Sequence, residues 1–147
     1  MKTRVLLVDD EEQFVEQLSE RLKIRNYDVN ACYSGEAAIE ELKQYLYDIV
    51  ILDVAMPGMD GIEALREIKE NRPLTEVIML TGHATVESAI EGMKLGAFDY
   101  LMKPCDTEEL TRKINNAHQR KTEQEERIRT AKAEQYSTSP WSALEDK

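Results

Sequence analysis

The chain has 147 residues, enough for one domain with a hydrophobic core. Its hydrophobic content of 41% is typical of a globular protein, and its charged content of 33% exceeds the roughly 25% of average soluble domains. The formal net charge of -10 argues against a nucleic-acid-binding surface, because such a surface needs a basic patch to neutralise phosphates.

The chain has two cysteines, Cys32 and Cys105, which lie far apart in the sequence. Their number and spacing predict neither a zinc cluster nor a disulfide framework, so we expect reduced thiols in a cytoplasmic protein. The first apolar run, residues 5–8, is too short for a signal peptide and ends in acidic residues. No segment approaches the roughly 20 apolar residues that cross a bilayer, and we expect no membrane contact.

The first part of the chain alternates predicted strands and helices. Residues 5–8 form a continuous apolar run, which predicts a strand buried on both faces. Asp10 lies three residues before Gln13, the spacing of a capping box at the start of a helix. Residues 27–33 alternate and predict a strand nearer a sheet edge, and Ser34 can cap the next helix. The expected apolar face of that helix comprises Ala38, Leu42, Tyr45 and Leu46.

The second part repeats this alternation. Residues 49–52 and 77–80 predict two more buried strands, and residues 98–102 predict a last one. Asp60 can cap a third helix, and Thr85 can cap a fourth. The fourth helix carries Val86, Ala89, Ile90 and Met93, and a fifth helix, with Asp106 and Glu109 as its capping box, is expected to bury Leu110, Ile114 and Ala117.

Five strands alternating with five helices predict a single doubly wound α/β domain, because right-handed crossovers leave no other simple packing. We assign residues 1–120 to this domain and residues 121–147 to a polar helical extension and a disordered tail. Ile128 is the one large apolar residue of the helix-forming part, and the tail is expected from Gln135 onward. Three apolar or aromatic residues near the end suggest either a docking peptide or, more commonly, a loose tail: Tyr136, Trp141 and Leu144.

Polar side chains follow four of the predicted buried strands. They are Asp9 and Asp10, Asp53, Thr81, and Lys103. The carboxyl ends of parallel strands share one edge of the sheet, where open α/β sheets bind their ligands. Each of these residues alone can be explained as a helix cap, a turn residue or a strand end. Together they predict a cleft with three carboxylates, a hydroxyl and an ammonium group.

Three carboxylates in one cleft need compensation. Two of them about 4 Å apart repel by roughly 4 kcal/mol at an effective dielectric constant near 20, and Lys103 supplies one positive charge. Either one carboxylate takes up a proton or a hard divalent cation binds, and oxygen ligands favour Mg²⁺. An aspartate beside Mg²⁺, with a hydroxyl and a lysine nearby, is suited to receive a phosphoryl group.

The sequence resembles the receiver domain of two-component response regulators from about Arg4 to Ala117. The matching motifs, in order and spacing, are Asp9-Asp10, residues 53–61, Thr81-Gly82 and Lys103-Pro104. The resemblance implies a flavodoxin-like (βα)5 fold with strand order 2-1-3-4-5. It also implies a receiver that promotes only its own phosphorylation and dephosphorylation, and that is no enzyme for other substrates.

The resemblance further implies roles for individual residues. Asp53 is expected to accept a phosphoryl group from the phosphohistidine of a histidine kinase or phosphotransfer protein. Asp10 and Asp53, with the backbone carbonyl of Ala55, are expected to ligate Mg²⁺, while Asp9 acts mainly through water. Lys103 is expected to pair with the phosphate and to precede Pro104 in a cis peptide bond.

The same resemblance implies a switch. Thr81 is expected to move toward the phosphate and Tyr100 to follow it inward, changing the face formed by the fourth helix, last strand and fifth helix. Met93 and Tyr100 are the expected exposed or mobile residues of that face, and a homodimer can form through it or through the helical extension. Ala55 and His83 occupy positions that tune the lifetime of the phosphorylated state in the family, although an ordinary loop histidine is the simpler interpretation of His83.

Other interpretations are kept open. A phosphatase of the haloacid dehalogenase type needs an aspartate two residues after its nucleophile, whereas Asp9 is followed at that distance by Glu11. A degenerate receiver would act as an interaction module without phosphorylation. The presence of the complete set of polar residues argues against this interpretation. Residues 81–104 are similar to receivers of enhancer-binding transcription activators. The chain can therefore be a stand-alone receiver, a phosphorelay intermediate or the amino-terminal piece of a larger regulator.

Overall fold

The computed structural model describes residues 1–82 and 85–138. His83, Trp141 and Leu144 therefore lie outside the described residues. The strands are β1 (Arg4–Val8), β2 (Asp28–Cys32), β3 (Ile49–Leu52), β4 (Glu76–Thr81) and β5 (Asp99–Met102). The helices are α1 (Glu12–Ile24), α2 (Gly35–Gln44), α3 (Gly61–Asn71), α4 (Val86–Lys94) and α5 (Thr107–Thr138).

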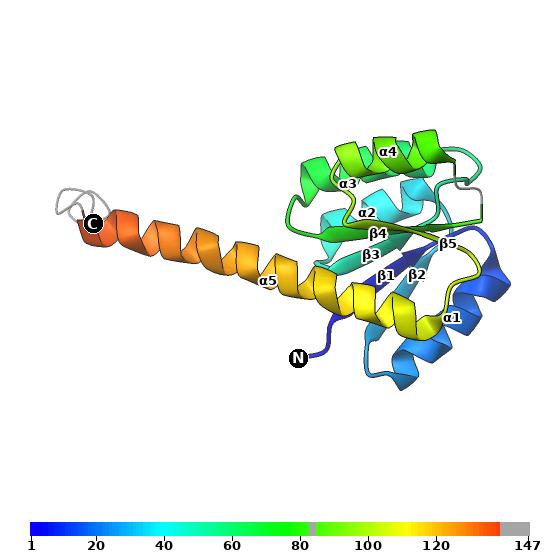
Figure 1. Cartoon of the computed structure of the whole chain (residues 1–147), viewed down its shortest axis with the longest axis horizontal. Helices are drawn as coiled ribbons and strands as arrows, with labels where there is room; N and C mark the ends of the chain where they lie inside the picture. Colours follow the sequence, from blue (N-terminus) through cyan, green and yellow to red (C-terminus); the bar gives the residue numbers. More distant parts are fainter. Residues whose placement is uncertain (83–84, 139–147) are drawn as a thin grey trace.

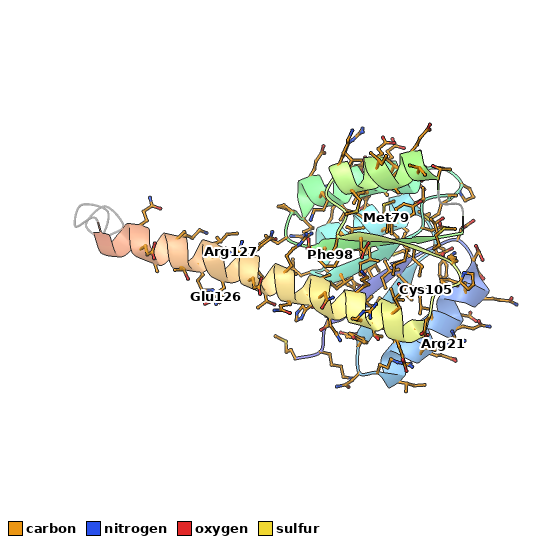
Figure 2. The ribbon with its side chains drawn as sticks, in the orientation of Figure 1. Arg21, Met79, Phe98, Cys105, Glu126 and Arg127 are labelled. Carbon is orange, nitrogen blue, oxygen red and sulfur yellow. The ribbon has the colours of Figure 1, made fainter. Side chains whose placement is uncertain are left out.

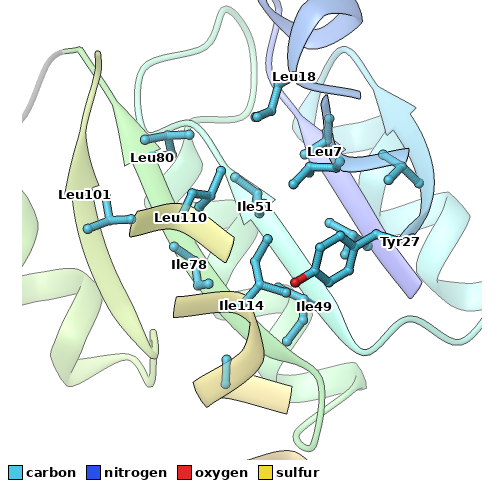
Figure 3. Packing of buried hydrophobic residues seen from close by; sticks show 14 of the residues in the cluster. Leu7, Leu18, Tyr27, Ile49, Ile51, Ile78, Leu80, Leu101, Leu110 and Ile114 are labelled. Carbon is cyan, nitrogen blue, oxygen red and sulfur yellow. The ribbon is translucent and has the colours of Figure 1, made fainter. Parts of the chain in front are cut away.

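All neighbouring strands are parallel, in the order β2-β1-β3-β4-β5, which confirms the predicted fold. Successive residues of a strand point to opposite faces of the sheet, so each buried strand contributes to two cores. Val5 and Leu7 pack with α1 and α5, whereas Leu6 and Val8 pack with α2 and α3. Figure 1 shows α1 and α5 on one side of the sheet and the remaining helices on the other, and Figure 3 shows the α1–α5 core around Ile114.

Three of the predicted helix caps are confirmed. The Ser34 side chain accepts a hydrogen bond from the backbone N–H of Ala37, and Asp60 accepts one from Glu63. Thr85 and Ser88 form a reciprocal capping box at the start of α4. Each cap satisfies a backbone donor that the first turn of a helix would otherwise leave unpaired.

The predicted cap at Asp10 is wrong. Helix α1 begins at Glu12 with Glu11 as its N-cap residue, and no side chain caps it. The N-cap lies one residue later than predicted, and Asp9 stabilises the turn after β1 by accepting a hydrogen bond from the Glu11 N–H at 3.0 Å. The Asp10 carboxylate therefore does not cap the helix and is available at the carboxyl edge of the sheet.

The predicted apolar face of the second helix is also partly wrong. Helix α2 ends at Gln44, and Tyr45 adopts an extended conformation with φ of -130° and ψ of 146°. Tyr45 and Leu46 are accordingly 50% and 64% exposed, and Ile39 is buried in the core beside Ala38 and Leu42. The helix stops early because the chain must turn here to enter β3.

Helix α5 crosses the sheet and continues beyond it. Leu110, Ile114 and Ala117 are buried as predicted. Past the sheet the helix projects away from the body of the molecule, and Figure 2 shows Glu126 and Arg127 on this projecting part. Residues 135–138, expected in the tail, belong to the helix. Among the described residues, no helix combines the length and hydropathy that crossing a membrane requires.

The base of the projecting helix is held by ion pairs at the amino edge of the sheet. Arg120 pairs with the buried carboxylate of Glu76, the first residue of β4. Its guanidinium also lies over the Phe98 ring, 4.6 Å from the ring centroid. Lys121 lies 3.2 Å from the Asp48 carboxylate, just before β3. These contacts fix where α5 leaves the domain.

Candidate functional site

The predicted polar residues are held at the carboxyl edge of the sheet by continuations of the strand ladder. The N–H of Asp53 donates to the carbonyl of Val8 at 2.9 Å, and the N–H of Lys103 donates to the carbonyl of Thr81 at 2.9 Å. The N–H of Asp9 donates to the carbonyl of Cys32 at 3.1 Å. These backbone hydrogen bonds therefore fix the positions of the three residues independently of the contacts among their side chains.

Three carboxylates meet at this edge. The ligand oxygens of Asp9, Asp10 and Asp53 all lie within 4.8 Å of one another. Asp9 and Asp53 are 5% and 3% exposed, whereas Asp10 is exposed. Oxygen ligands clustered in this way, with one side open to solvent, suit a hard cation such as Mg²⁺.

Lys103 lies inside the carboxylate cluster. Its Nζ is 2.6 Å from Asp9 Oδ2 and 3.9 Å from Asp53 Oδ2. The same ammonium is 3.3 Å from Glu11 and 4.2 Å from the centroid of the Phe14 ring. In this state Lys103 is bound mainly to Asp9 and stands at ion-pair distance from Asp53.

The two partners have shifted pKa values. Burial raises the pKa of Asp9, and the hydrogen bonds from Lys103 and from the Glu11 N–H offset this only in part. Burial acts to lower the pKa of Lys103, but its hydrogen bond to Asp9 and the charges of Asp9 and Asp53 outweigh burial, so the pKa is raised. Lys103 is therefore a firmly charged ammonium, and the cluster favours additional positive charge.

Thr81 and Tyr100 lie on neighbouring strands beside the cluster. Thr81 is fully buried as the last residue of β4. Tyr100, on β5, packs against the core formed with α2 and α3, and its hydroxyl is 2.9 Å from Ser88 Oγ of α4. Tyr100 is therefore half-buried and tied to α4, while Met93 of α4 is 46% exposed.

The sequence model of the response regulator receiver domain matches residues 5–115 of the chain. This range contains the five strands, apart from the first residue of β1, and every residue of the cluster. The chain belongs to the response regulator receiver family. The predicted family and fold are thereby confirmed, and the match favours the receiver over the phosphatase interpretation.

The chain is also similar to curated regulatory proteins. It is 37% identical to the regulatory protein AtoC of Escherichia coli over 79% of this chain and 25% of AtoC. It is 38% identical to the transcriptional regulatory protein ZraR of Escherichia coli over 77% of this chain and 26% of ZraR. The chain thus spans about a quarter of the length of these curated relatives.

Solved receiver structures are similar over most of the chain. A response regulator receiver domain protein from Clostridium thermocellum is 37% identical, with a TM-score of 0.78, covering 82% of this chain and 97% of that one. A CheY-like receiver domain protein from Methanospirillum hungatei is 25% identical, with a TM-score of 0.82, covering 84% of this chain and 99% of that one.

The receiver structure brings most of the predicted site together. Asp9, Asp10, Asp53 and Lys103 form one cluster, with Thr81 at the end of the neighbouring strand. Ala55 is exposed in the loop after β3, where its N–H lies 3.3 Å from Asp53 Oδ1. The Lys103–Pro104 peptide bond is cis, as the resemblance implied.

Sequence reasoning did not identify Glu11 and Phe14 as members of the receiver site. Both contact the ammonium of Lys103, and Glu11 does so across 92 residues of sequence. The acidic run after β1 marks Glu11 as a candidate, but its contact with Lys103 arises only from the fold. We find no local signal that singles out Phe14, whose spacing is also that of a core residue.

Proposed function

We propose that Asp53 is the phosphoacceptor of this receiver and takes its phosphoryl group from the phosphohistidine of a histidine kinase or phosphotransfer protein. The observation that supports this is the position of Asp53 in the carboxylate cluster, buried beside Asp9 and 3.9 Å from Lys103. A carboxylate oxygen of Asp53 attacks phosphorus, the P–N bond of phosphohistidine breaks, and the imidazole keeps the bonding electron pair.

Asp10 and Asp53, with the backbone carbonyl of Ala55, would hold Mg²⁺, and Asp9 would contribute mainly through water. The donor set fits this ion, because it consists of hard oxygens gathered within 4.8 Å and partly open to solvent. Bound Mg²⁺ neutralises charge on the oxygens of the transferring phosphoryl group. Lys103 supplies the second positive charge by moving from Asp9 toward the phosphoryl oxygens.

Phosphorylation would then be read on the face formed by α4, β5 and α5. Thr81 moves toward the new phosphoryl oxygens, and the half-buried ring of Tyr100 follows it inward. Shifting a two-state equilibrium from 1:99 to 99:1 takes about 5.5 kcal/mol of differential stabilisation. Charge-assisted hydrogen bonds from Thr81 and Lys103 to the phosphoryl group supply free energy of this kind.

The similarity to AtoC and ZraR supports a role as the receiver part of a transcription regulator. Receiver homodimers would form through the α4-β5-α5 face or the α5 extension. A stand-alone receiver and a phosphorelay intermediate are the other settings in which it would act.

Intact-mass measurement after incubation with acetyl phosphate and MgCl2 tests the proposal. We expect one labile phosphoryl adduct on the wild-type chain and none on Asp53→Asn. Asp28→Asn, which changes an exposed carboxylate at the start of β2, should still take up the adduct. Loss of the adduct when EDTA replaces MgCl2 tests the requirement for the metal.

Two other results would contradict the proposal. A chain that takes up no label under any of these conditions is a degenerate receiver that acts without phosphorylation. Label on Asp53→Asn would place the phosphoacceptor elsewhere.

A further inference from the structure

The loop between β3 and α3, residues 54–60, carries the Ala55 carbonyl proposed for the metal site. It is closed at its base by a hydrogen bond of 2.7 Å from the N–H of Gly61 to the carbonyl of Val54. Met56 anchors it from inside, since its side chain is only 7% exposed. Two contacts therefore hold the loop on either side of Ala55, and the outer part of the loop has a contact of its own.

The outer part of this loop is bound by a side chain from another helix. Glu36, in the first turn of α2, accepts a hydrogen bond from the backbone N–H of Met59 through Oε1, at 2.6 Å. A short bond from an N–H to an ionised carboxylate is among the stronger hydrogen bonds of proteins. The contact joins segments 23 residues apart in the sequence.

Two glycines allow this approach. Gly58 has φ of +79°, and a Cβ there would lie 3.2 Å from Glu36 Oε1. Gly35 precedes Glu36 in α2, and a Cβ there would lie 3.2 Å from the carbonyl oxygen of Met59. The start of α2 and the tip of the loop are therefore packed backbone to backbone, with the Glu36 carboxylate closing the contact.

We propose that Glu36 is a positioning residue for the metal site: by holding the Met59 N–H, it fixes the loop that presents the Ala55 carbonyl to Mg²⁺. This inference rests on the proposed Mg²⁺ site of the preceding subsection. Glu36 does not itself ligate the ion in this arrangement, because its carboxylate is committed to the loop backbone. Outer residues that orient metal ligands affect the affinity for the metal even though they do not touch it.

The test is a titration with MgCl2 alone, followed by the backbone amide NMR shifts of Asp9, Asp10 and Ala55. Glu36→Ala removes the acceptor and should raise the Mg²⁺ dissociation constant about tenfold. Glu36→Gln keeps a carbonyl oxygen for the Met59 N–H but loses the charge that strengthens the bond, and its dissociation constant should lie between those of the wild type and Glu36→Ala. Glu40→Ala is the matched control, because it removes an equal charge from the exposed surface of the same helix.

The outcomes separate this inference from the proposed function. If Glu36→Gln weakens Mg²⁺ binding as much as Glu36→Ala does, the negative charge is what matters and the positioning role is wrong. Equal dissociation constants for all variants and the wild type also overturn it and leave the Mg²⁺ site intact. A wild-type chain that binds no Mg²⁺ overturns the metal site itself, and the role of Glu36 with it.

Discussion

At the scale of single residues, the end of β3 and the start of α3 meet at a point where only glycine fits. A Cβ at Gly61 would overlap the carbonyl oxygen of Asp53 and lie 2.5 Å from the Cα of Val54. Both obstacles are backbone atoms, which cannot rotate away as a flexible side chain can. Gly61 therefore keeps α3 seated directly under the residue proposed to carry the phosphoryl group.

We expect Gly61→Ala to lower the free energy of unfolding by about 1–3 kcal/mol, because the backbone must shift to admit the methyl group. Gly82→Ala is the control, since a Cβ there would meet nothing within 4 Å. Urea denaturation of the two variants beside the wild type measures the difference. Equal losses of stability in the two variants would contradict this account of Gly61.

The site residues that could be predicted from sequence are those that directly end an apolar run. Asp9, Asp53, Thr81 and Lys103 were found in this way, because parallel strands bring their carboxyl ends to one edge. Glu11 could not be found, since its contact with Lys103 depends on how α1 leaves β1. The wrong cap at Asp10 has the same origin: the spacing fits a capping box, but the helix begins one residue later, with Glu11 as its N-cap residue.

At the scale of elements, a hydrogen bond between the hydroxyls of Tyr100 and Ser88 joins β5 to the capping box of α4. The inward movement proposed for the Tyr100 ring would break this bond. On that proposal the bond would stabilise the unphosphorylated arrangement of the α4-β5-α5 face, and α4 would take part in the switch from its first turn.

Tyr100→Phe removes the hydroxyl and keeps the ring. We expect the unphosphorylated receiver to lose about 0.5–1.5 kcal/mol of stability, the usual net value of such a bond, measured by urea denaturation. Phosphorylation by acetyl phosphate should become faster, because the inward state is reached more easily. Tyr33→Phe, at an exposed tyrosine beyond the end of β2, should change neither quantity. Slower phosphorylation of Tyr100→Phe would mean that the bond supports the active state.

Element prediction was reliable where periodicity and caps agreed and failed where they did not. Ser34 correctly marks the start of α2, but the apolar spacing that includes Tyr45 and Leu46 continues past its end, because the link to β3 is itself partly apolar. The apolar spacing of α4 is also incomplete as a guide to burial: Val86 and Ile90 are 77% and 49% exposed. An apolar stripe of this kind indicates a contact face. The sequence does not say whether that face packs against the core of the same domain or against another molecule.

At the scale of the whole molecule, the projecting part of α5 is rooted in the domain by Arg120 and Lys121. Beyond this root, over residues 122–135, Ile128 is the one large apolar residue, and it is 44% exposed. If this part of the helix pairs with a second copy of itself, as proposed above, Ile128 is the large apolar side chain available for the contact.

We expect the phosphorylated wild-type chain to form a dimer in sedimentation equilibrium, and Ile128→Lys to raise its dissociation constant roughly tenfold or more, since burying an isoleucine contributes about 1.5–3 kcal/mol. Thr130→Lys adds the same charge about 200° around the helix and should have a smaller effect. A wild-type chain that stays monomeric at all concentrations, with and without acetyl phosphate, would rule out the dimer arm.

The path of α5 has one more consequence. The helix starts beside the carboxylate cluster, runs antiparallel to the strands and leaves at Glu76 and Asp48, the opposite pole of the sheet. A phosphodonor protein that binds at the carboxylate cluster and a partner that binds the projecting helix would therefore occupy opposite ends of the molecule. The two proteins would then be able to bind at the same time, so phosphorylation of the receiver and binding of its output partner would not exclude each other.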